Sequence, residues 1–390
     1  MISANYMKEI QALHRPAVVA SDDLNIGHQQ SIDVRAVRNV SDGWTPAGGS
    51  SIRRKLDAYG VDDNRPTLSR LNDGKYNVFI KKDKSGSPNL SQGAYVSKRG
   101  EDEYGSFKWL NPKGLTKYQT KEVAVVSFSS KAELEQLART YAERPLPEFL
   151  VKVLNGEDCL DTNLYERSPR LADFVPPLSD SQHGYLIAPN TPYCGKSVLD
   201  TYVHAPETLK NSRDGVILCT YAIHPGIQSA FLEGRNHKSG LEKLDASTPT
   251  TQREIDNKTN VESLTSILSL KKEHLPQLEK LREETLRHLH DVYAVDESDS
   301  VRMFFHFPVA EKTATLHLHT WVNKGDHPLN EPRSFDLDTI IDHLRSGGDV
   351  DDLVLNRNGG SYFLPTSDSI KDISGIPFKG IRDNTLNLPL

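Results

Sequence analysis

Apolar and polar residues alternate over two neighbouring stretches near residue 310, and this alternation predicts a β-hairpin. The stretches are residues 301–307 (VRMFFHF) and 314–322 (ATLHLHTWV), and the connection PVAEKT between them is short enough for a hairpin. Because successive side chains of a strand point to opposite faces, the aliphatic residues of the second strand share one face and His317 and His319 share the other. The pattern therefore predicts one face packed on a core and a second face that carries two imidazoles.

The same periodicities predict further elements along the chain. Additional strands are expected at residues 75–82, 105–110, 122–128, 185–189 and 215–223. Helices are expected at residues 129–143, 260–292 and 334–348. The polar stretch 234–258 is expected to be a loop. Strands and helices that occupy different parts of the chain indicate an α+β protein.

Capping residues predict where these helices begin and end. Ser129 or Ser130 is expected to cap the first helix, and Asn260 the second. Pro276 predicts a break near residues 272–274 and a new start with the proline in the first turn. For the third helix we expect Ser334 as N-cap and Gly347 just past its end.

The length of 390 residues exceeds that of one ordinary domain, so two folded units with flexible ends are expected. The polar residues 1–65 predict a poorly ordered region, and residues 66–160 a small α+β domain. A Pro-rich stretch then marks a boundary, followed by a larger α+β domain at 165–350 and a C-terminal extension at 351–390. A mean hydropathy of -0.54 also indicates substantial loop content.

Charge and cysteine content exclude several classes of protein. The net charge is -6 and no basic block dominates, so we expect no extended nucleic-acid binding, although a few local cations could still hold a small nucleotide. The three cysteines fit no metal spacing and indicate thiols in a reducing compartment. No run of apolar residues is long enough to predict a membrane span, and the first residues do not show the pattern of a signal peptide. We expect a cytoplasmic protein, and export by a route that reads no such signal stays open.

His317 and His319 have a chemical use when they project from one face. A neutral imidazole is a nucleophile near pH 7, and its attack on phosphorus divides one displacement into two easier steps. A neighbouring imidazole can bind the non-bridging oxygens or assist proton transfer. This chemistry needs no cofactor and no metal. Histidine pairs on strands are also often structural or zinc ligands, but His306, His327 and His343 lack diagnostic zinc spacing.

Residues from about 261 to 345 resemble the C-terminal domain of the scavenger mRNA decapping enzymes, which belong to the histidine-triad (HIT) superfamily. The order of parts carries the resemblance: KKEHLPQLEKL (271–281), VRMFFHFP (301–308), TLHLHTWV (315–322), then Pro328 or Pro332, Arg333, and a helix LDTIIDHL (337–344). The resemblance implies a HIT-like antiparallel sheet with helices for the domain at 165–350.

The resemblance also implies roles for individual residues. His317 matches the central, nucleophilic histidine of the family, His319 the last histidine, which contacts phosphates, and His306 an upstream histidine that lines the phosphate pocket. Thr315 stands where the family has its first histidine, which helps to orient the nucleophile. An alternative register makes His319 the nucleophile and Trp321 the third position, but it lengthens the gap from His306 further.

Four further residues are candidates for binding substrate. Lys312, Lys324 and Arg333 could receive phosphates at the rim of the site, and solvated surface charge is the alternative for each. Trp321 could stack on a base or pack as an ordinary large aromatic side chain.

The resemblance implies a phosphohydrolase, in effect a pyrophosphatase, that cleaves a phosphoanhydride through a covalent nucleotidyl-histidine. The implied substrates are capped-RNA fragments or dinucleoside polyphosphates, and a homodimer is expected by analogy. Two alternatives stay open. One is a HIT-type nucleotidyl transferase, since the same adduct serves both reactions. The other, favoured by Thr315, is a catalytically inactive module that binds a nucleotide or a protein.

Overall fold

The computed structural model describes residues 122–154, 167–191, 196–212, 215–227, 251–324 and 331–383, together with four short strands earlier in the chain. Those strands are β1 (Leu68–Arg70), β2 (Tyr76–Ile80), β3 (Ala94–Lys98) and β4 (Lys108–Leu110), and they pair in that order as an antiparallel sheet. The strands predicted at 75–82 and 105–110 are thus confirmed as β2 and β4. The region predicted to be poorly ordered, residues 1–65, lies outside the described residues.

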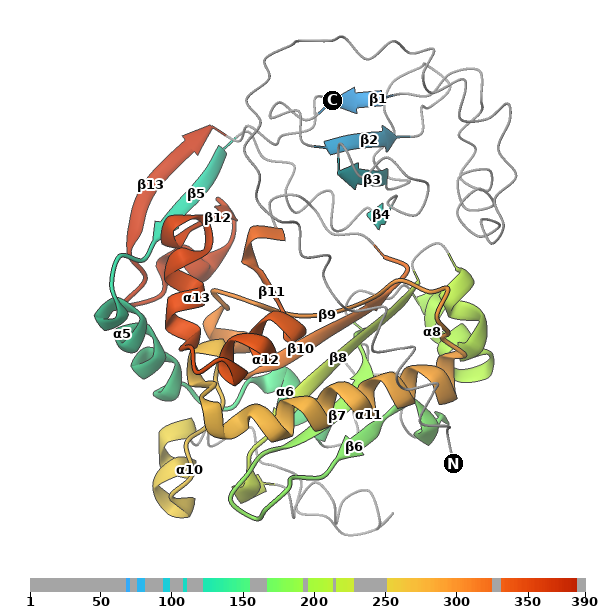
Figure 1. Cartoon of the computed structure of the whole chain (residues 1–390), viewed down its shortest axis with the longest axis horizontal. Coiled ribbons are helices and arrows are strands. Elements are labelled where there is room, and N and C mark those ends of the chain that lie inside the picture. Colours follow the sequence, from blue (N-terminus) through green and yellow to red (C-terminus); the bar gives the residue numbers. More distant parts are fainter. Residues whose placement is uncertain are drawn as a thin grey trace.

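A six-stranded antiparallel sheet forms the centre of the protein (Figure 1). Its order is β11 (Ser334–Asp336), β9 (Val301–His306), β10 (His317–Val322), β8 (Val216–Ile223), β7 (Gly184–Pro189) and β6 (Asp173–Val175). The predicted hairpin is confirmed, because β9 and β10 pair antiparallel. The strands predicted at 185–189 and 215–223 are confirmed as β7 and β8. Every residue of β7 and β8 is buried, so both faces of the sheet are covered here.

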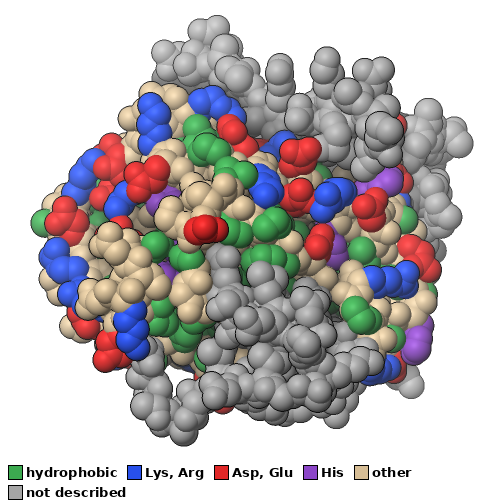
Figure 2. All heavy atoms as spheres, turned by 90° about the horizontal axis from the view of Figure 1, so that it is seen from below, with side chains coloured by type: hydrophobic (Ala, Val, Ile, Leu, Met, Phe, Trp, Pro, Cys, Tyr) green, Lys and Arg blue, Asp and Glu red, His purple; other side chains and the backbone are tan. Residues whose placement is uncertain are grey.

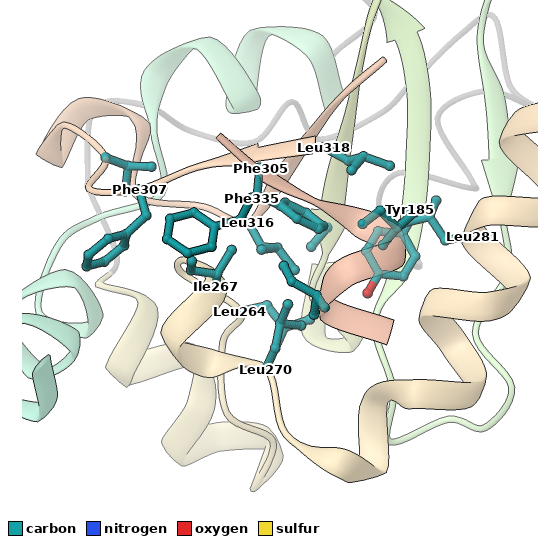
Figure 3. Packing of buried hydrophobic residues seen from close by; sticks show 14 of the residues in the cluster. Tyr185, Leu264, Ile267, Leu270, Leu281, Phe305, Phe307, Leu316, Leu318 and Phe335 are labelled. Atoms are coloured by element: carbon teal, nitrogen blue, oxygen red, sulfur yellow. The ribbon is translucent and has the colours of Figure 1, made fainter. Parts of the chain in front are cut away.

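The larger hydrophobic core lies on one face of this sheet, beneath α11 (Leu275–Tyr293) and α12 (Leu337–Arg345). Figure 3 shows Leu318 of β10 and Leu316, the residue before it begins, in this core with aromatic residues of β9 and β11. The helix α11 begins as predicted, since a 3-10 turn η6 (Lys272–His274) precedes it and Pro276 lies in its first turn. Its apolar side chains recur every three or four residues and therefore face the sheet.

A smaller hydrophobic cluster covers part of the opposite face of the sheet. It contains Leu150 of α6 (Glu148–Leu154) and Ile255 of α10 (Gln252–Thr259), which pack with Tyr221 and other residues of β7 and β8. The histidine face of β10 is therefore bordered by helices on its β8 side.

A third sheet joins distant parts of the chain, in the order β12 (Ser361–Pro365), β5 (Glu122–Ser127) and β13 (Phe378–Asp383). Two helices flank it, α5 (Lys131–Ala142), capped by Ser130 as predicted, and α13 (Val350–Asn356). Side chains of this sheet share the larger core with the central sheet. The boundaries predicted near 160–165 and 350 stay predictions, but elements on both sides of each contribute to one core.

Three local predictions are wrong. The stretch expected to be a loop, 234–258, contains all of α10 except its last residue, and a capping box between Thr251 and Glu254 closes the first turn of this helix. Asn260 does not begin a helix but ends α10 in the left-handed conformation, and residues 261–265 are not helical. Ser334 opens the short strand β11, and Asp336 precedes α12. Only the third case depends on a distant partner, since β11 pairs with β9, whereas the bonds that begin and end α10 join near neighbours.

The remaining elements are short. They are α8 (Lys196–His204) and the 3-10 turns η2 (Pro169–Leu171), η4 (Pro206–Asn211), η5 (Ile267–Ser269), η7 (Glu311–Thr313), η8 (Glu331–Arg333), η9 (Arg357–Gly360) and η10 (Ser369–Asp372).

Candidate active site

Three histidines meet on the face of the central sheet that lies opposite the larger core. His317 and His319 are two residues apart on β10, and His306 is the last residue of the adjacent strand β9. The ring centroids of His306 and His319 are 4.4 Å apart, and those of His317 and His319 are 5.0 Å apart. His319 is 7% exposed, while His306 and His317 are half-buried. The antiparallel register of β9 and β10 therefore produces a compact group of three imidazoles.

A hydrogen bond fixes the tautomer of His317. Its Nδ1 lies 2.7 Å from the carbonyl oxygen of Thr315, and a carbonyl can only accept, so Nδ1 carries the proton. Burial lowers the pKa of His317 below its usual range, although the bond to Thr315 acts in the opposite direction. The ring is consequently neutral near pH 7, and the lone pair is on Nε2.

Aromatic rings surround the histidines. Phe304 stacks on His319 with centroids 5.3 Å apart, and its ring meets that of Trp321 nearly at right angles at 4.8 Å. On the other side, the rings of Tyr221 and His317 lie 6.3 Å apart. Phe149 packs against Tyr221 at 5.4 Å. This apolar surrounding disfavours a charged imidazole and so supports the neutral state of His317.

The predicted triad position Thr315 is buried and lies just before β10. In the structure, the backbone carbonyl of Thr315 accepts the hydrogen bond from the imidazole of His317. That contact does not depend on the side chain at position 315. The bond to Nδ1 of His317 is therefore present without a histidine at position 315.

The predicted substrate-binding residues fall into different positions. Trp321 is on the same face of β10 as the two histidines, and the ammonium of Lys324 lies 4.2 Å from the centroid of its ring. Lys324 is buried, which differs from the solvated surface charge considered as its alternative. Lys312 is exposed on the turn η7, and among the described contacts none joins it to the three imidazoles.

Arg333 is also buried, at 3% exposure, immediately before β11. One Nη2 proton is donated to the carbonyl of Pro308 at 2.7 Å. Its Nε and Nη1 atoms are buried and make no hydrogen bond within the described part of the chain. The next residue, Ser334, pairs directly with His306 across β11 and β9. The backbone at Ser334 is thus beside the strand that ends in His306, while no described contact joins the guanidinium of Arg333 to the three imidazoles.

Two residues of the site were not foreseen from the sequence, Phe304 and Tyr221. Each lies opposite a histidine across a strand pair: Phe304 faces His319, and Tyr221 faces His317. The alternation within each strand predicted which residues share a face, but the register between strands is a tertiary property. Only the spacing from Phe304 to His306 contained a local signal, since residues two apart lie on one face.

Metal sites and membrane spans are not found among the described residues. These residues contain no group of three or more His, Cys, Asp or Glu side chains arranged to hold a metal ion. None of the described helices combines the length and apolar character needed to cross a membrane.

Comparison with known proteins identifies the segment that contains the histidines. Residues 259–334 match a family profile described as "Scavenger mRNA decapping enzyme C-term binding". No curated protein matches the chain. The match runs from the end of α10 to the first residue of β11, so it includes His306, His317, His319 and Arg333. The expected resemblance is confirmed: the protein has an α+β fold with a HIT-like segment of the decapping type.

Proposed function

We propose that this protein is a nucleotide phosphohydrolase that cleaves a phosphoanhydride through a covalent nucleotidyl adduct on His317. The substrate class is a capped-RNA fragment or a dinucleoside polyphosphate, in keeping with the description of the matching family profile. The observation that carries the proposal is the state of His317. Its Nδ1 proton is held by the Thr315 carbonyl, so a neutral ring presents Nε2 as nucleophile.

The first step forms a bond between Nε2 of His317 and the α-phosphorus of the nucleotide. The bond from that phosphorus to the bridging oxygen breaks, and the leaving phosphate or nucleotide departs with both electrons. In the second step water attacks the same phosphorus and the P–N bond breaks, which releases the nucleotide and restores His317. Dividing the displacement in this way lowers each barrier, because both steps use a good nucleophile or a good leaving group.

The neighbouring histidines are suited to the charge that develops on phosphate. His319 is next to His317 on β10, and His306 is 4.4 Å from His319 between ring centroids. An N–H group of either ring could bind a non-bridging oxygen or deliver a proton to the leaving group. Arg333 brings permanent positive charge and a planar set of donors that matches a phosphate. These contacts would be strongest as negative charge moves towards the leaving oxygen.

The Thr315 position also bears on the alternative of an inactive module. Loss of a histidine side chain there would weaken the enzyme if that side chain oriented the nucleophile. Here the backbone carbonyl of residue 315 supplies the orienting bond. This geometry supports an active site in which Thr315 replaces histidine without loss of the reactive tautomer.

The adduct provides the direct test. The protein is incubated with a capped dinucleotide or a dinucleoside polyphosphate, quenched in base, and examined by intact mass spectrometry. We expect the mass of one nucleotidyl group on the wild type and released nucleotide in solution. His317→Ala should abolish the adduct and reduce turnover by about 10³-fold or more, since it removes the nucleophile itself.

His290→Ala is the matched control, because this histidine is on α11 and is paired with Asp291 on the surface. It should form the adduct like the wild type. An adduct that persists in His317→Ala would reject His317 as nucleophile. Tight nucleotide binding with neither adduct nor product would reject the enzyme in favour of a binding module. An adduct resolved by an acceptor other than water would instead identify a transferase.

A further inference from the structure

Two other histidines form a buried pair outside the candidate active site. His183 comes just before β7 and His224 just after β8, so adjacent strands bring them to the same end of the central sheet. Their rings meet edge to face with centroids 5.0 Å apart. His183 is 5% exposed and His224 is 4% exposed. Such deep burial of two imidazoles calls for specific hydrogen bonds.

Both rings bind the segment 261–264, which follows α10 and leads towards the 3-10 turn η5. The Nε2 of His224 donates to the carbonyl of Val261 at 3.1 Å, because its Nδ1 is already the acceptor for the Gly226 N–H at 2.9 Å. The Nε2 of His183 accepts a longer hydrogen bond from the Leu264 N–H, at 3.4 Å. The pair therefore holds both ends of this short segment.

The segment 261–264 is in turn bonded to the strand that carries the nucleophile. The carbonyl of Leu264 accepts from the N–H of Leu316 at 2.7 Å, and the carbonyl of Leu316 accepts from Ala222 at 2.9 Å. Leu316 directly follows Thr315, whose carbonyl binds Nδ1 of His317. Figure 3 shows Leu264 and Leu316 together in the larger core. An unbroken path of hydrogen bonds and peptide bonds therefore joins the pair to His317.

We propose that His183 and His224 are positioning residues that hold the segment 261–264 and thereby keep the Thr315 carbonyl in place beneath the nucleophilic imidazole. The inference rests on the proposed function, since it assigns the pair a role in the reactivity of His317. The pair acts through the backbone and touches no reacting atom. The pair fixes the tautomer and the orientation of the His317 ring. Both properties affect the rate of the chemical step rather than the binding of substrate.

The pair can perform this role only while both rings are neutral. Nδ1 of His224 and Nε2 of His183 are acceptors, and protonation would remove both acceptors. The ionisable groups that face the pair are Asp256, whose carboxylate is 3.6 Å from Nε2 of His224, and His274, which opposes a charge on His183. Burial lowers the pKa of both rings, most strongly for His183. The support for His317 is therefore present near neutral pH and is lost in acid.

Two substitutions at each position separate positioning from simple packing. In His224→Gln the side-chain amide can still reach the Val261 carbonyl, whereas the shorter amide of His224→Asn can replace only the bond from Gly226. In His183→Gln the side-chain oxygen can still accept from the Leu264 N–H, whereas the shorter side chain of His183→Asn cannot reach it. We expect the Asn variants to lower kcat by about 10-fold with KM unchanged, as for other groups that orient a reactive residue, and the Gln variants to retain most of it.

A spectroscopic measurement tests the same inference without turnover. Long-range ¹H–¹⁵N spectra of histidine-labelled protein report the tautomer of the His317 ring. The wild type and the Gln variants should show Nδ1–H, and the Asn variants a mixture of tautomers. His288→Asn is the control, because His288 is an equally buried histidine on α11 whose described contacts are with Asp173 and Tyr293 and not with the segment 261–264. It should leave the His317 signals unchanged.

The outcomes are distinct. Unchanged His317 signals in both Asn variants would overturn the positioning role, and so would equal losses in the Asn, Gln and His288 variants. A wild type without turnover, combined with altered His317 signals in the Asn variants, would reject the proposed function and keep the positioning pair. If an Asn variant does not fold, the wild type is titrated with acid. The His317 signals should then change from Nδ1–H to a mixture of tautomers as His183 or His224 takes a proton. If these signals change only when His317 itself is protonated, the inference is overturned.

Discussion

At the scale of single residues, Arg333 has the most demanding environment of the candidate substrate-binding residues. A guanidinium is always charged in proteins, and an unpaired buried charge is strongly destabilising. Arg333 is 3% exposed, and its one side-chain hydrogen bond within the described residues goes to the Pro308 carbonyl. An anion bound by Nε and Nη1 would satisfy the remaining donors. Under the proposed function, the phosphates of the substrate are that anion.

Because Arg333 has unused donors, we expect pyrophosphate to bind there and to stabilise the folded protein. At a concentration one hundred times its Kd, an anion that binds only the folded state adds about 2.7 kcal/mol, which raises Tm. Differential scanning fluorimetry should show this rise for the wild type and not for Arg333→Met. Arg282→Met is the control, since Arg282 is already paired with Asp338, and it should keep the rise. An equal rise in Arg333→Met would place the anion elsewhere.

At the scale of elements, α11 anchors the sheet that carries the histidines. It buries Leu278, Leu281 and Leu289 against the central sheet, and Figure 3 shows Leu281 beside Tyr185 of β7. The helix contributes no residue to the imidazole cluster, which lies on the other face of the sheet. Its apolar side chains instead share the larger core with residues of β7, β8 and β10.

Leu281→Ala should lower the free energy of unfolding by about 2–5 kcal/mol, because it leaves a cavity beneath fully buried side chains. The exposed Glu283→Ala on the same helix should change it by about 0.5 kcal/mol or less. Urea denaturation followed by circular dichroism measures both. A loss for Leu281→Ala no larger than that of Glu283→Ala would show that this part of the core is not closely packed.

At the scale of the whole molecule, several buried histidines make folding sensitive to acid. Burial lowers the pKa of His183 and His224, and that of His288 to about 4. Since each ring binds a proton more readily in the unfolded chain, the unfolded state takes up more protons as the pH falls. The stability that these neutral rings contribute is therefore complete above about pH 6.5 and is lost as the pH falls through their lowered pKa values.

His288→Gln should make the free energy of unfolding less dependent on pH between about 6.5 and 4, because it removes one of these titrations. The measurement is the urea midpoint at a series of pH values. His290→Gln, which changes a surface histidine paired with Asp291, should keep the slope of the wild type. A steeper slope in His288→Gln would contradict a lowered pKa for His288 in the folded protein.

On the face of the molecule seen in Figure 2, acidic and basic side chains are interspersed, and they form no large patch of one charge. Recognition under the proposed function therefore depends on local groups beside the histidines. Among the described residues, Lys324 lies over the ring of Trp321 and Arg302 over the ring of Phe304, which itself stacks on His319. The expected homodimer stays a prediction.

The sequence alone determined the features that depend on near neighbours. Alternation along residues 314–322 placed His317 and His319 on one face, Pro276 located the start of α11, and Ser130 the start of α5. These follow from local sterics and hydrogen bonds, which adjacent residues supply. The order of strands and histidines also sufficed to identify the HIT-like segment.

Tertiary structure alone decided the contacts between distant residues. It places His306 next to His319 and positions the Thr315 carbonyl, rather than a side chain, to accept from His317. It also buries Arg333 with donors that make no hydrogen bond among the described residues. It also paired β5 with strands far along the chain, at positions 361–383. Register, burial and ring orientation result from the packing of whole elements, and no local pattern encodes them.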